Sequence, residues 1–258
     1  MINIPTLKSF SKQDVLQAIK NDEIVLISEI SEHEFKILCR EIGDLNDRYG
    51  EFYDVVDTGE DYKTTNIPIS QTREDTGVHT DSSARDYCPE YLSLFCANQG
   101  AFGGESYFVD MRSVFNDLKK YRPELLKYLS QDFYRDVVTP GAENNLENVR
   151  RNKFPIIRHD DSGLLEFRYM RYWIERAYKK LSLEHDLDSA HLDLLDSGQL
   201  DLLDSYLMND KYRSTFMLKN NQAVIFKNSY FPHGRTKYEE NKLNRRRLIR
   251  VWFDRMNW

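Results

Sequence analysis

The chain has 258 residues, of which 40% are hydrophobic and 30% are charged, so it holds enough apolar material for a folded core. Its 36 basic and 42 acidic side chains are mostly interspersed and leave a net charge of −6, which argues against a nucleic-acid-binding or membrane-binding protein. No apolar run approaches the roughly 18 residues of a membrane span, and the three cysteines are too few for a disulfide framework, so we expect a cytoplasmic protein.

The first predicted elements are a helix, a strand and a second helix. Ser11 is placed to cap the first helix, and the β-rich run EIVLIS follows it. Ser31 and Glu34 form a capping-box pattern ahead of a stretch with helical apolar spacing. Residues 53–83 are then polar and aperiodic, which predicts a long loop, and we expect it to close over a nearby site when substrate binds.

Strand-like and helical stretches alternate from there to the C-terminus. They comprise strands at 91–97, 105–110, 133–138, 154–158 and 164–169, helices at 113–129, 172–183 and 190–207, and the closing strands STFML, QAVIFK and RRRLIRVWF. Pro123 suits a first-turn position, so the helix over 113–129 is expected to be interrupted or to restart there. No linker-like composition divides the chain, so we predict a single domain over residues 1–258. Many short strands with helices gathered early and midway predict a mainly β fold with flanking helices, in a sandwich or jelly-roll arrangement.

A His-x-Asp pattern is the first candidate for chemistry. It occurs three times, at His79–Asp81, His159–Asp161 and His191–Asp193. His191 lies in a helical pattern, where positions i and i+2 point apart, and His159 lies in the polar turn composition HDDSG. His79 and Asp81 stand at the end of the long loop, and in an extended segment both side chains would share a face and reach one metal ion.

His233 is the natural third ligand of that ion. It follows the strand QAVIFK and stands between Pro232 and Gly234, which favour an exposed bend. Two histidines and one carboxylate on one face are the ligand set of non-haem Fe(II) oxygenases. Taken singly, each histidine is more often a surface or core imidazole than a ligand, so the pattern alone leaves that alternative open.

Three segments surround these residues: HTDSS, LSLFCANQGAFGGESYFVD and FPHGRTKYEENKLNRRRLIRVWF. In order, spacing and placement they resemble the taurine dioxygenase family of 2-oxoglutarate-dependent oxygenases, and they are similar to its clavaminate synthase-like branch. The resemblance covers roughly residues 15–255. It implies a double-stranded β-helix (jelly roll) in which His79, Asp81 and His233 bind Fe(II). The reaction it implies consumes 2-oxoglutarate and O2, releases succinate and CO2, and oxidises a substrate C–H bond.

The same resemblance assigns contacts for the co-substrate and the substrate. The family's Arg-x-x-x-Arg pair corresponds to Arg246, which would bind the far carboxylate of 2-oxoglutarate, and Arg250, which would hold an anionic group of the substrate. A strand alternates faces, so a register slip of one residue would put Arg247 in the pocket instead. Ser106 corresponds to the family's hydroxyl after a Gly-Gly turn, a second co-substrate contact. Arg168 is a further candidate substrate contact, with a surface ion pair as the alternative.

The predicted activity is therefore hydroxylation of a small anionic metabolite, such as a free amino acid or an amino-acid derivative. Desaturation or cyclisation in natural-product biosynthesis would use the same residues and stays an alternative, whereas the retained Asp81 disfavours halogenation. A non-catalytic metal-binding jelly-roll module would not need the anion pocket that Arg246 and Ser106 suggest. A Zn²⁺ or Mn²⁺ hydrolase would not need 2-oxoglutarate, so succinate formation separates it from the oxygenase.

Overall fold

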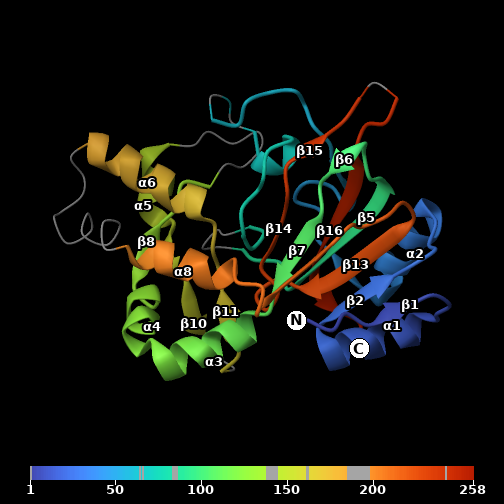
Figure 1. Cartoon of the computed structure of the whole chain (residues 1–258), viewed down its shortest axis with the longest axis horizontal. Coiled ribbons are helices and arrows are strands. Elements are labelled where there is room, and N and C mark those ends of the chain that lie inside the picture. The colour runs from blue at the N-terminus through green and yellow to red at the C-terminus, as the bar shows by residue number, and fades with distance from the viewer. Residues whose placement is uncertain are drawn as a thin grey trace.

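The structure is a computed structural model that describes residues 2–63, 65, 67–82, 87–137, 145–160, 163–184, 198–241 and 243–258. Figure 1 shows two regions side by side: a sheet region flanked by the first two helices, and a region made mostly of helices from the middle of the chain.

A seven-stranded sheet forms the larger region. Its strands follow the order β1-β2-β13-β5-β16-β3, with β4 paired to β16 beside this path. The strands are β1 (Thr6–Leu7), β2 (Ile24–Ile27), β3 (Gly43–Leu45), β4 (Tyr53–Val55), β5 (Tyr91–Asn98), β13 (Gln222–Lys227) and β16 (Arg247–Met256). Among these described pairs, β1 and β2 run parallel and all the others run antiparallel. The sheet therefore contains strands from both the N-terminal and the C-terminal parts of the chain.

Two helices cover one face of this sheet, α1 (Lys12–Asp22) and α2 (Glu32–Ile42). Both begin at the predicted capping boxes, since Ser11 and Ser31 each accept from the main chain three residues on. Their apolar stripes are buried against the alternate residues of β5, β13 and β16 that point to this side. That core includes Val15, Ile19, Phe35, Leu38, Ile42, Phe95, Ile225, Ile249, Val251 and Phe253.

The other face of the large sheet packs against a three-stranded sheet of order β12-β7-β14. Its strands are β7 (Ser106–Val109), β12 (Arg213–Phe216) and β14 (His233–Arg235). Phe108 of the small sheet is fully buried in one cluster with Phe226 and Leu248 of the large sheet. The two sheets therefore enclose a core, and β14 and β16 bring C-terminal residues to its rim.

The remaining elements build the helical region and three short ladders. The helices are α3 (Met111–Tyr121), α4 (Pro123–Leu129), α5 (Leu146–Arg151), α6 (Arg171–Leu183) and α8 (Gln199–Leu207). The ladders are β6 (Phe102–Gly103) with β15 (Tyr238–Glu239), β8 (Asp132–Tyr134) with β9 (Lys153–Pro155), and β10 (Ile157–His159) with β11 (Leu165–Phe167). Pro123 takes the first helical turn of α4, as predicted. Buried residues of α3, α4, α6 and α8 form a core of their own.

The structure corrects two expectations about architecture. The sequence predicts a mainly β protein, but the described chain is mixed α/β, because the middle helices bury a separate core. The sequence also predicts an irregular loop over residues 53–83, yet β4 lies at its start and a 3₁₀ helix, η1 (Ile69–Gln71), lies within it. Residues 190–197 of the predicted helix over 190–207 lie outside the described residues, and α8 accounts for its second half.

Hydrogen bonds hold parts of this loop segment in place. Thr58 donates its main-chain N–H to the carbonyl of Gln71 at 3.0 Å. The guanidinium of Arg73 pairs with Asp57 at 2.6 Å. These contacts tie the two sides of the segment together, while its closure over substrate stays a prediction.

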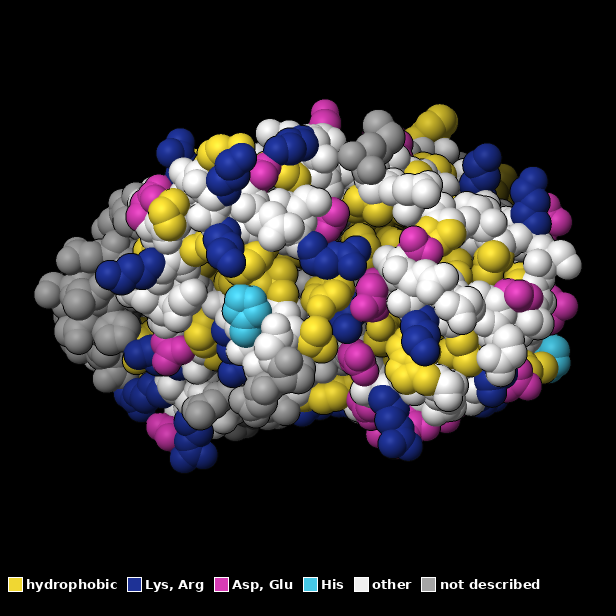
Figure 2. Space-filling model, turned by 90° about the horizontal axis from the view of Figure 1, so that it is seen from below, with side chains coloured by type: hydrophobic (Ala, Val, Ile, Leu, Met, Phe, Trp, Pro, Cys, Tyr) yellow, Lys and Arg dark blue, Asp and Glu magenta, His cyan; other side chains and the backbone are white. Residues whose placement is uncertain are grey.

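The surface is charged with both signs. Figure 2 shows basic and acidic side chains interspersed on the face it presents, without a continuous basic area. In the described ranges, no helix is both long enough and apolar enough to cross a membrane.

Candidate metal centre

The main chains of His79 and His233 are paired directly, although the two residues are far apart in the sequence. Each donates its N–H to the carbonyl of the other at 2.8 Å, so the segment before Asp81 lies beside β14 as an antiparallel bridge. On its other side, Thr80 donates its main-chain N–H to the carbonyl of Tyr169 at 2.8 Å. The backbone around the His-x-Asp motif is therefore fixed from both sides.

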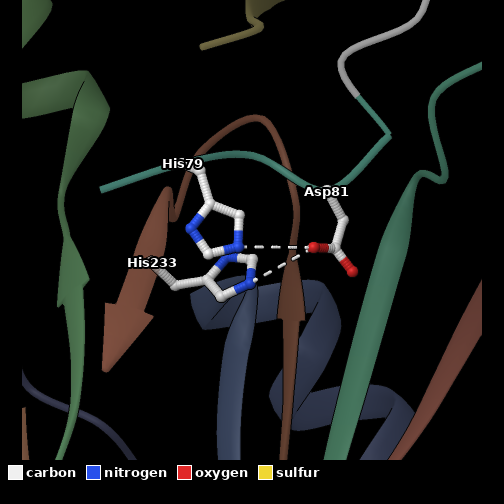
Figure 3. A group of neighbouring side chains, drawn as sticks. All are labelled: His79, Asp81 and His233. Atoms are coloured by element: carbon white, nitrogen blue, oxygen red, sulfur yellow. Dashed lines mark ion pairs between the residues drawn. The ribbon is translucent and has the colours of Figure 1, made fainter. Parts of the chain in front are cut away.

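Three side chains converge at this bridge (Figure 3). The Nε2 atoms of His79 and His233 lie 3.5 and 3.8 Å from the same oxygen, Oδ1 of Asp81. One ligand atom from each residue lies within 4.8 Å of the other two, and among the described residues no other group of His, Cys, Asp or Glu meets this test. Metal bonds to N and O ligands are about 2.0–2.2 Å long, so atoms at this spacing fit around one ion after small side-chain adjustments.

The Asp81 carboxylate is buried and negatively charged. Burial alone would raise its pKa, but the Arg250 guanidinium holds the pKa below its ordinary value. Its second oxygen, Oδ2, accepts from Nε1 of Trp252 at 2.7 Å and lies 3.0 Å from Nη1 of Arg250. Oδ1 is therefore the oxygen that faces the imidazoles.

The two imidazoles are suited to binding a metal in their neutral form. Burial, followed by the proximity of His79, lowers the pKa of His233 to about 3. Nδ1 of His79 lies 3.0 Å from the carbonyl oxygen of Gly77, which makes Nδ1 the donor and leaves the Nε2 lone pair free toward Asp81. Neutral imidazoles with an ionised carboxylate are what a divalent metal requires, so these residues fit the implied iron.

The three residues line a pocket of about 440 Å³, part of which is open to solvent. The other lining residues are Val55, Ser70, Thr76, Leu94, Ser106, Gly234, Arg235, Arg246, Leu248 and Arg250. The predicted co-substrate contacts Arg246 and Ser106 and the predicted substrate contact Arg250 thus share one pocket with the metal-binding group.

Comparison with known proteins assigns the family. The profile of the taurine catabolism dioxygenase TauD, TfdA family matches residues 1–252. The chain belongs to this family. Membership confirms the predicted resemblance, and the His-Asp-His group fits the iron that the resemblance implies.

Solved structures of such enzymes share the fold. An asparagine oxygenase in complex with Fe(II), 3-hydroxyasparagine and succinate has a TM-score of 0.65 and 14% identity, covering 94% of this chain and 78% of that one. PvcB from Pseudomonas aeruginosa has a TM-score of 0.61 and 14% identity, with 96% and 84% covered. A taurine dioxygenase from Burkholderia xenovorans has a TM-score of 0.60 and 15% identity, with 95% and 83% covered. These similarities show that the chain has the TauD-type, jelly-roll-like fold.

A relative similar in sequence is the uridine-5'-phosphate dioxygenase of a Streptomyces species. It is 26% identical over 186 residues, which make up 71% of this chain and 63% of that protein. The chain thus matches somewhat less than two thirds of the length of this relative.

Arg246 is one of two buried arginines that line the TauD-type pocket, the other being Arg235. Only 4% of Arg246 is exposed, and its guanidinium lies 5.0 Å from the centre of the Tyr238 ring. A Cβ on Gly104 would lie 3.1 Å from Nε of Arg246, and Gly104 has a φ of +82°, so this turn of the predicted Gly-Gly motif favours glycine twice over. The turn packs closely on the arginine and holds it in the pocket.

Arg247 points to the opposite side of the sheet. Its guanidinium pairs with Glu32 of α2 at 2.8 Å and with Asp54 of β4 at 2.9 Å. The alternation along β16 therefore directs Arg246 and Arg250, and not Arg247, toward the pocket.

The structure locates other sequence candidates away from the pocket. The Arg168 guanidinium forms an ion pair with Glu166, and Arg168 is not one of the lining residues, so its role in substrate binding stays a prediction. His159 is exposed on β10, with its ring edge-on to Phe115. Asp161, His191 and Asp193 of the other His-x-Asp patterns lie outside the described residues.

Sequence reasoning did not single out three polar contributors to the site: Tyr53, Ser70 and Asn228. The hydroxyl oxygens of Tyr53 and Ser70 are buried and have no hydrogen-bond partner among the described residues. Tyr53 packs on Arg250, whose guanidinium carbon lies 4.9 Å from its ring centre. No local pattern in the sequence identifies these three residues.

Proposed function

We propose that this TauD-family enzyme oxidises a C–H bond of a small anionic metabolite, with a free amino acid or amino-acid derivative as the first candidate. His79, Asp81 and His233 would hold Fe(II), and Arg246 with Ser106 would hold 2-oxoglutarate. Residues 1–258 would form one domain, and its two facing sheets would be a double-stranded β-helix. One observation carries the proposal: a buried arginine lines the same small pocket as a His-Asp-His group.

The proposed metal ligands and Arg246 have separate roles. Two imidazoles and a carboxylate on one side of an ion leave its other positions for co-substrate and O2. With these bound, the iron would activate O2, which is the oxidant: one oxygen atom would go to succinate as 2-oxoglutarate loses CO2, and the other would go to the substrate. Arg246 offers a planar fork that matches a carboxylate, and its burial strengthens that attraction because little water competes. The Ser106 hydroxyl would add a neutral donor.

The substrate preference follows from the rest of the lining. Arg250 supplies a second cation, and the unpartnered Ser70 hydroxyl supplies a polar contact. Val55, Leu94 and Leu248 supply apolar walls. The pocket must also hold the co-substrate beside the metal-binding group, which favours a small substrate. A nucleoside monophosphate is the second candidate, because the uridine-5'-phosphate dioxygenase is a relative and its substrate is also an anion.

The test is a screen of free amino acids, their simple derivatives and nucleoside monophosphates with Fe(II), 2-oxoglutarate and O2. We expect succinate together with a product that has gained one oxygen atom. Loss of two hydrogens would indicate desaturation or cyclisation by the same residues. Asp81→Ala should abolish both products, whereas Arg250→Ala should still form succinate slowly and yield little oxidised substrate. Turnover without 2-oxoglutarate would favour a hydrolase and contradict the proposal.

A further inference from the structure

The two oxygens of Asp81 have different surroundings. Oδ1 faces Nε2 of His79 and Nε2 of His233, at 3.5 and 3.8 Å. Oδ2 faces β16, where Nε1 of Trp252 donates to it at 2.7 Å and Nη1 of Arg250 lies at 3.0 Å. Trp252 and Arg250 are two residues apart on one strand, so both point to this side of the sheet.

The indole of Trp252 is firmly held. It is 7% exposed, and the Tyr49 ring packs on it edge-on with 5.2 Å between ring centres. The Arg250 guanidinium also lies over the Trp252 ring, with 4.9 Å from the guanidinium carbon to the ring centre. An indole N–H is a donor only, so its bond to Oδ2 has one direction at any pH at which the carboxylate is ionised.

We infer that Trp252 is a positioning residue for Asp81: it retains Oδ2, so that Asp81 offers Oδ1 alone to the metal. This inference rests on the proposed function, since it takes Asp81 as a ligand. The terminal torsion of an aspartate is soft, and an unrestrained carboxylate could turn and bind the ion through both oxygens. That would occupy a position needed by 2-oxoglutarate or O2.

Trp252 is better suited to this task than Arg250. In the proposed function Arg250 also attracts the anionic group of the substrate, so its contact with Asp81 would be shared during turnover. The hydrogen bond from Trp252 to Asp81 does not depend on whether Arg250 contacts the substrate. Asp81 therefore keeps one fixed partner at Oδ2 whether or not substrate is present.

The test compares Trp252→Phe, which keeps an aromatic ring but removes the donor, with Trp258→Phe as the matched control. Trp258 is 60% exposed and packs edge-on against the Tyr91 ring, outside the pocket. Loss of a hydrogen bond to a metal ligand typically weakens metal binding about 10- to 100-fold, so we expect Mn²⁺ alone to bind at least about 10-fold more weakly to Trp252→Phe. The visible absorption bands of bound Co²⁺ should also change, because the number of oxygens on the metal changes. Trp258→Phe should match the unaltered protein in both measurements.

A second measurement keeps the inference testable if Trp252→Phe folds poorly. The chain has three tryptophans, and their indole N–H groups give separate ¹⁵N NMR signals. In metal-free Asp81→Ala, one indole signal should shift and exchange faster with solvent, and it should not be the signal that disappears in Trp258→Phe. Unchanged indole signals would overturn the inference.

The outcomes separate this inference from the proposed function. If His79→Ala abolishes Mn²⁺ binding while Trp252→Phe leaves the affinity and the Co²⁺ bands unchanged, only the role of Trp252 is wrong. If the unaltered protein does not bind Mn²⁺, or binds it equally after His79→Ala, the proposed metal site is wrong and the role of Trp252 falls with it.

Discussion

Asn228 holds the main chain of Asp81 from both sides. Its Oδ1 accepts the N–H of Asp81, and its Nδ2 donates to the carbonyl of Asp81, both at 3.0 Å. Asn228 is fully buried and follows β13 directly, five residues before His233. One short segment of the chain thus carries one proposed ligand and fixes the backbone of another.

Asn228→Ala should destabilise the metal-free protein. It leaves the buried N–H of Asp81 without its partner and the carbonyl of Asp81 with only the long contact from Cys88 Sγ at 4.0 Å, and an unsatisfied buried polar group costs about 1–3 kcal/mol. Urea unfolding measures the difference. Asn46→Ala is the control, because the Asn46 amide donates to Asp254 at the exposed surface and surface substitutions usually change stability by less than about 0.5 kcal/mol. Equal effects of the two substitutions would contradict a structural role for the hydrogen bonds between Asn228 and the main chain of Asp81.

The choice among the histidines can be tested without a substrate. Anaerobic protein with Fe(II) and 2-oxoglutarate should develop a weak visible charge-transfer band, because chelation of a keto acid requires two adjacent open positions on the metal. His79→Ala and Asp81→Ala should each remove the band. His159→Ala should retain it, since that ring lies on exposed β10 against Phe115. A band that survives in His79→Ala would show that another pattern binds the iron.

Local patterns predicted the parts of the fold whose causes are local. The caps at Ser11 and Ser31 and the restart at Pro123 depend on residues within one helical turn, and the structure confirms them. The three-residue strand β4 was missed because its pairing is long-range: Val55 lies opposite Leu248 of β16. A short polar run does not indicate such a partner.

In the candidate site, too, local patterns identified some residues, while residues that depend on long-range contacts were missed. His-x-Asp spacing and its sequence context identified the converging His79 and Asp81, and the family resemblance identified the pocket-facing Arg246. Asn228 was not identified, because its role depends on where the chain turns after β13 and on which backbone groups it meets there. For Arg168 the sequence offered both a substrate contact and an ion pair, but it could not identify Glu166 as the partner of that ion pair.

Co-substrate binding should distinguish the two neighbouring arginines. Arg246→Ala should weaken 2-oxoglutarate binding by about 1.5–3 kcal/mol, the typical contribution of a hydrogen bond to a charged group. Ser106→Ala should weaken it less, by about 0.5–1.5 kcal/mol for a neutral donor. Arg247→Ala is the matched control and should bind normally, because its guanidinium pairs with Glu32 and Asp54 on the other side of the sheet. Titration of 2-oxoglutarate into the anaerobic Fe(II) protein measures all three, and a larger defect in Arg247→Ala would reverse the assignment.

The Glu32–Arg247 pair predicts a pH-dependent contribution to stability. Hydrogen bonds from Arg247 and then from Lys36 lower the pKa of Glu32 from 4.5 to about 2. A carboxyl whose pKa is lower in the folded state stabilises the fold above its unfolded pKa, and this stabilisation is lost as the pH falls toward the folded pKa. The contribution should therefore be complete above a pH of about 4.5 and should disappear toward about 2.

Glu32→Gln tests this dependence. The Glu32 side chain is 35% exposed, so solvent screens the pair, and we expect a loss of at most about 1 kcal/mol near neutral pH. Because a protonated Glu32 resembles glutamine, the difference between the two proteins should shrink as the pH is lowered below about 4.5, and added salt should reduce it at neutral pH. Urea unfolding over a pH series measures it, with Glu41→Gln, an exposed position on the same helix, as the control. In an Arg247→Ala background Glu32→Gln should have much less effect, and a difference that grew on acidification would mean that the pair does not hold α2 to β16.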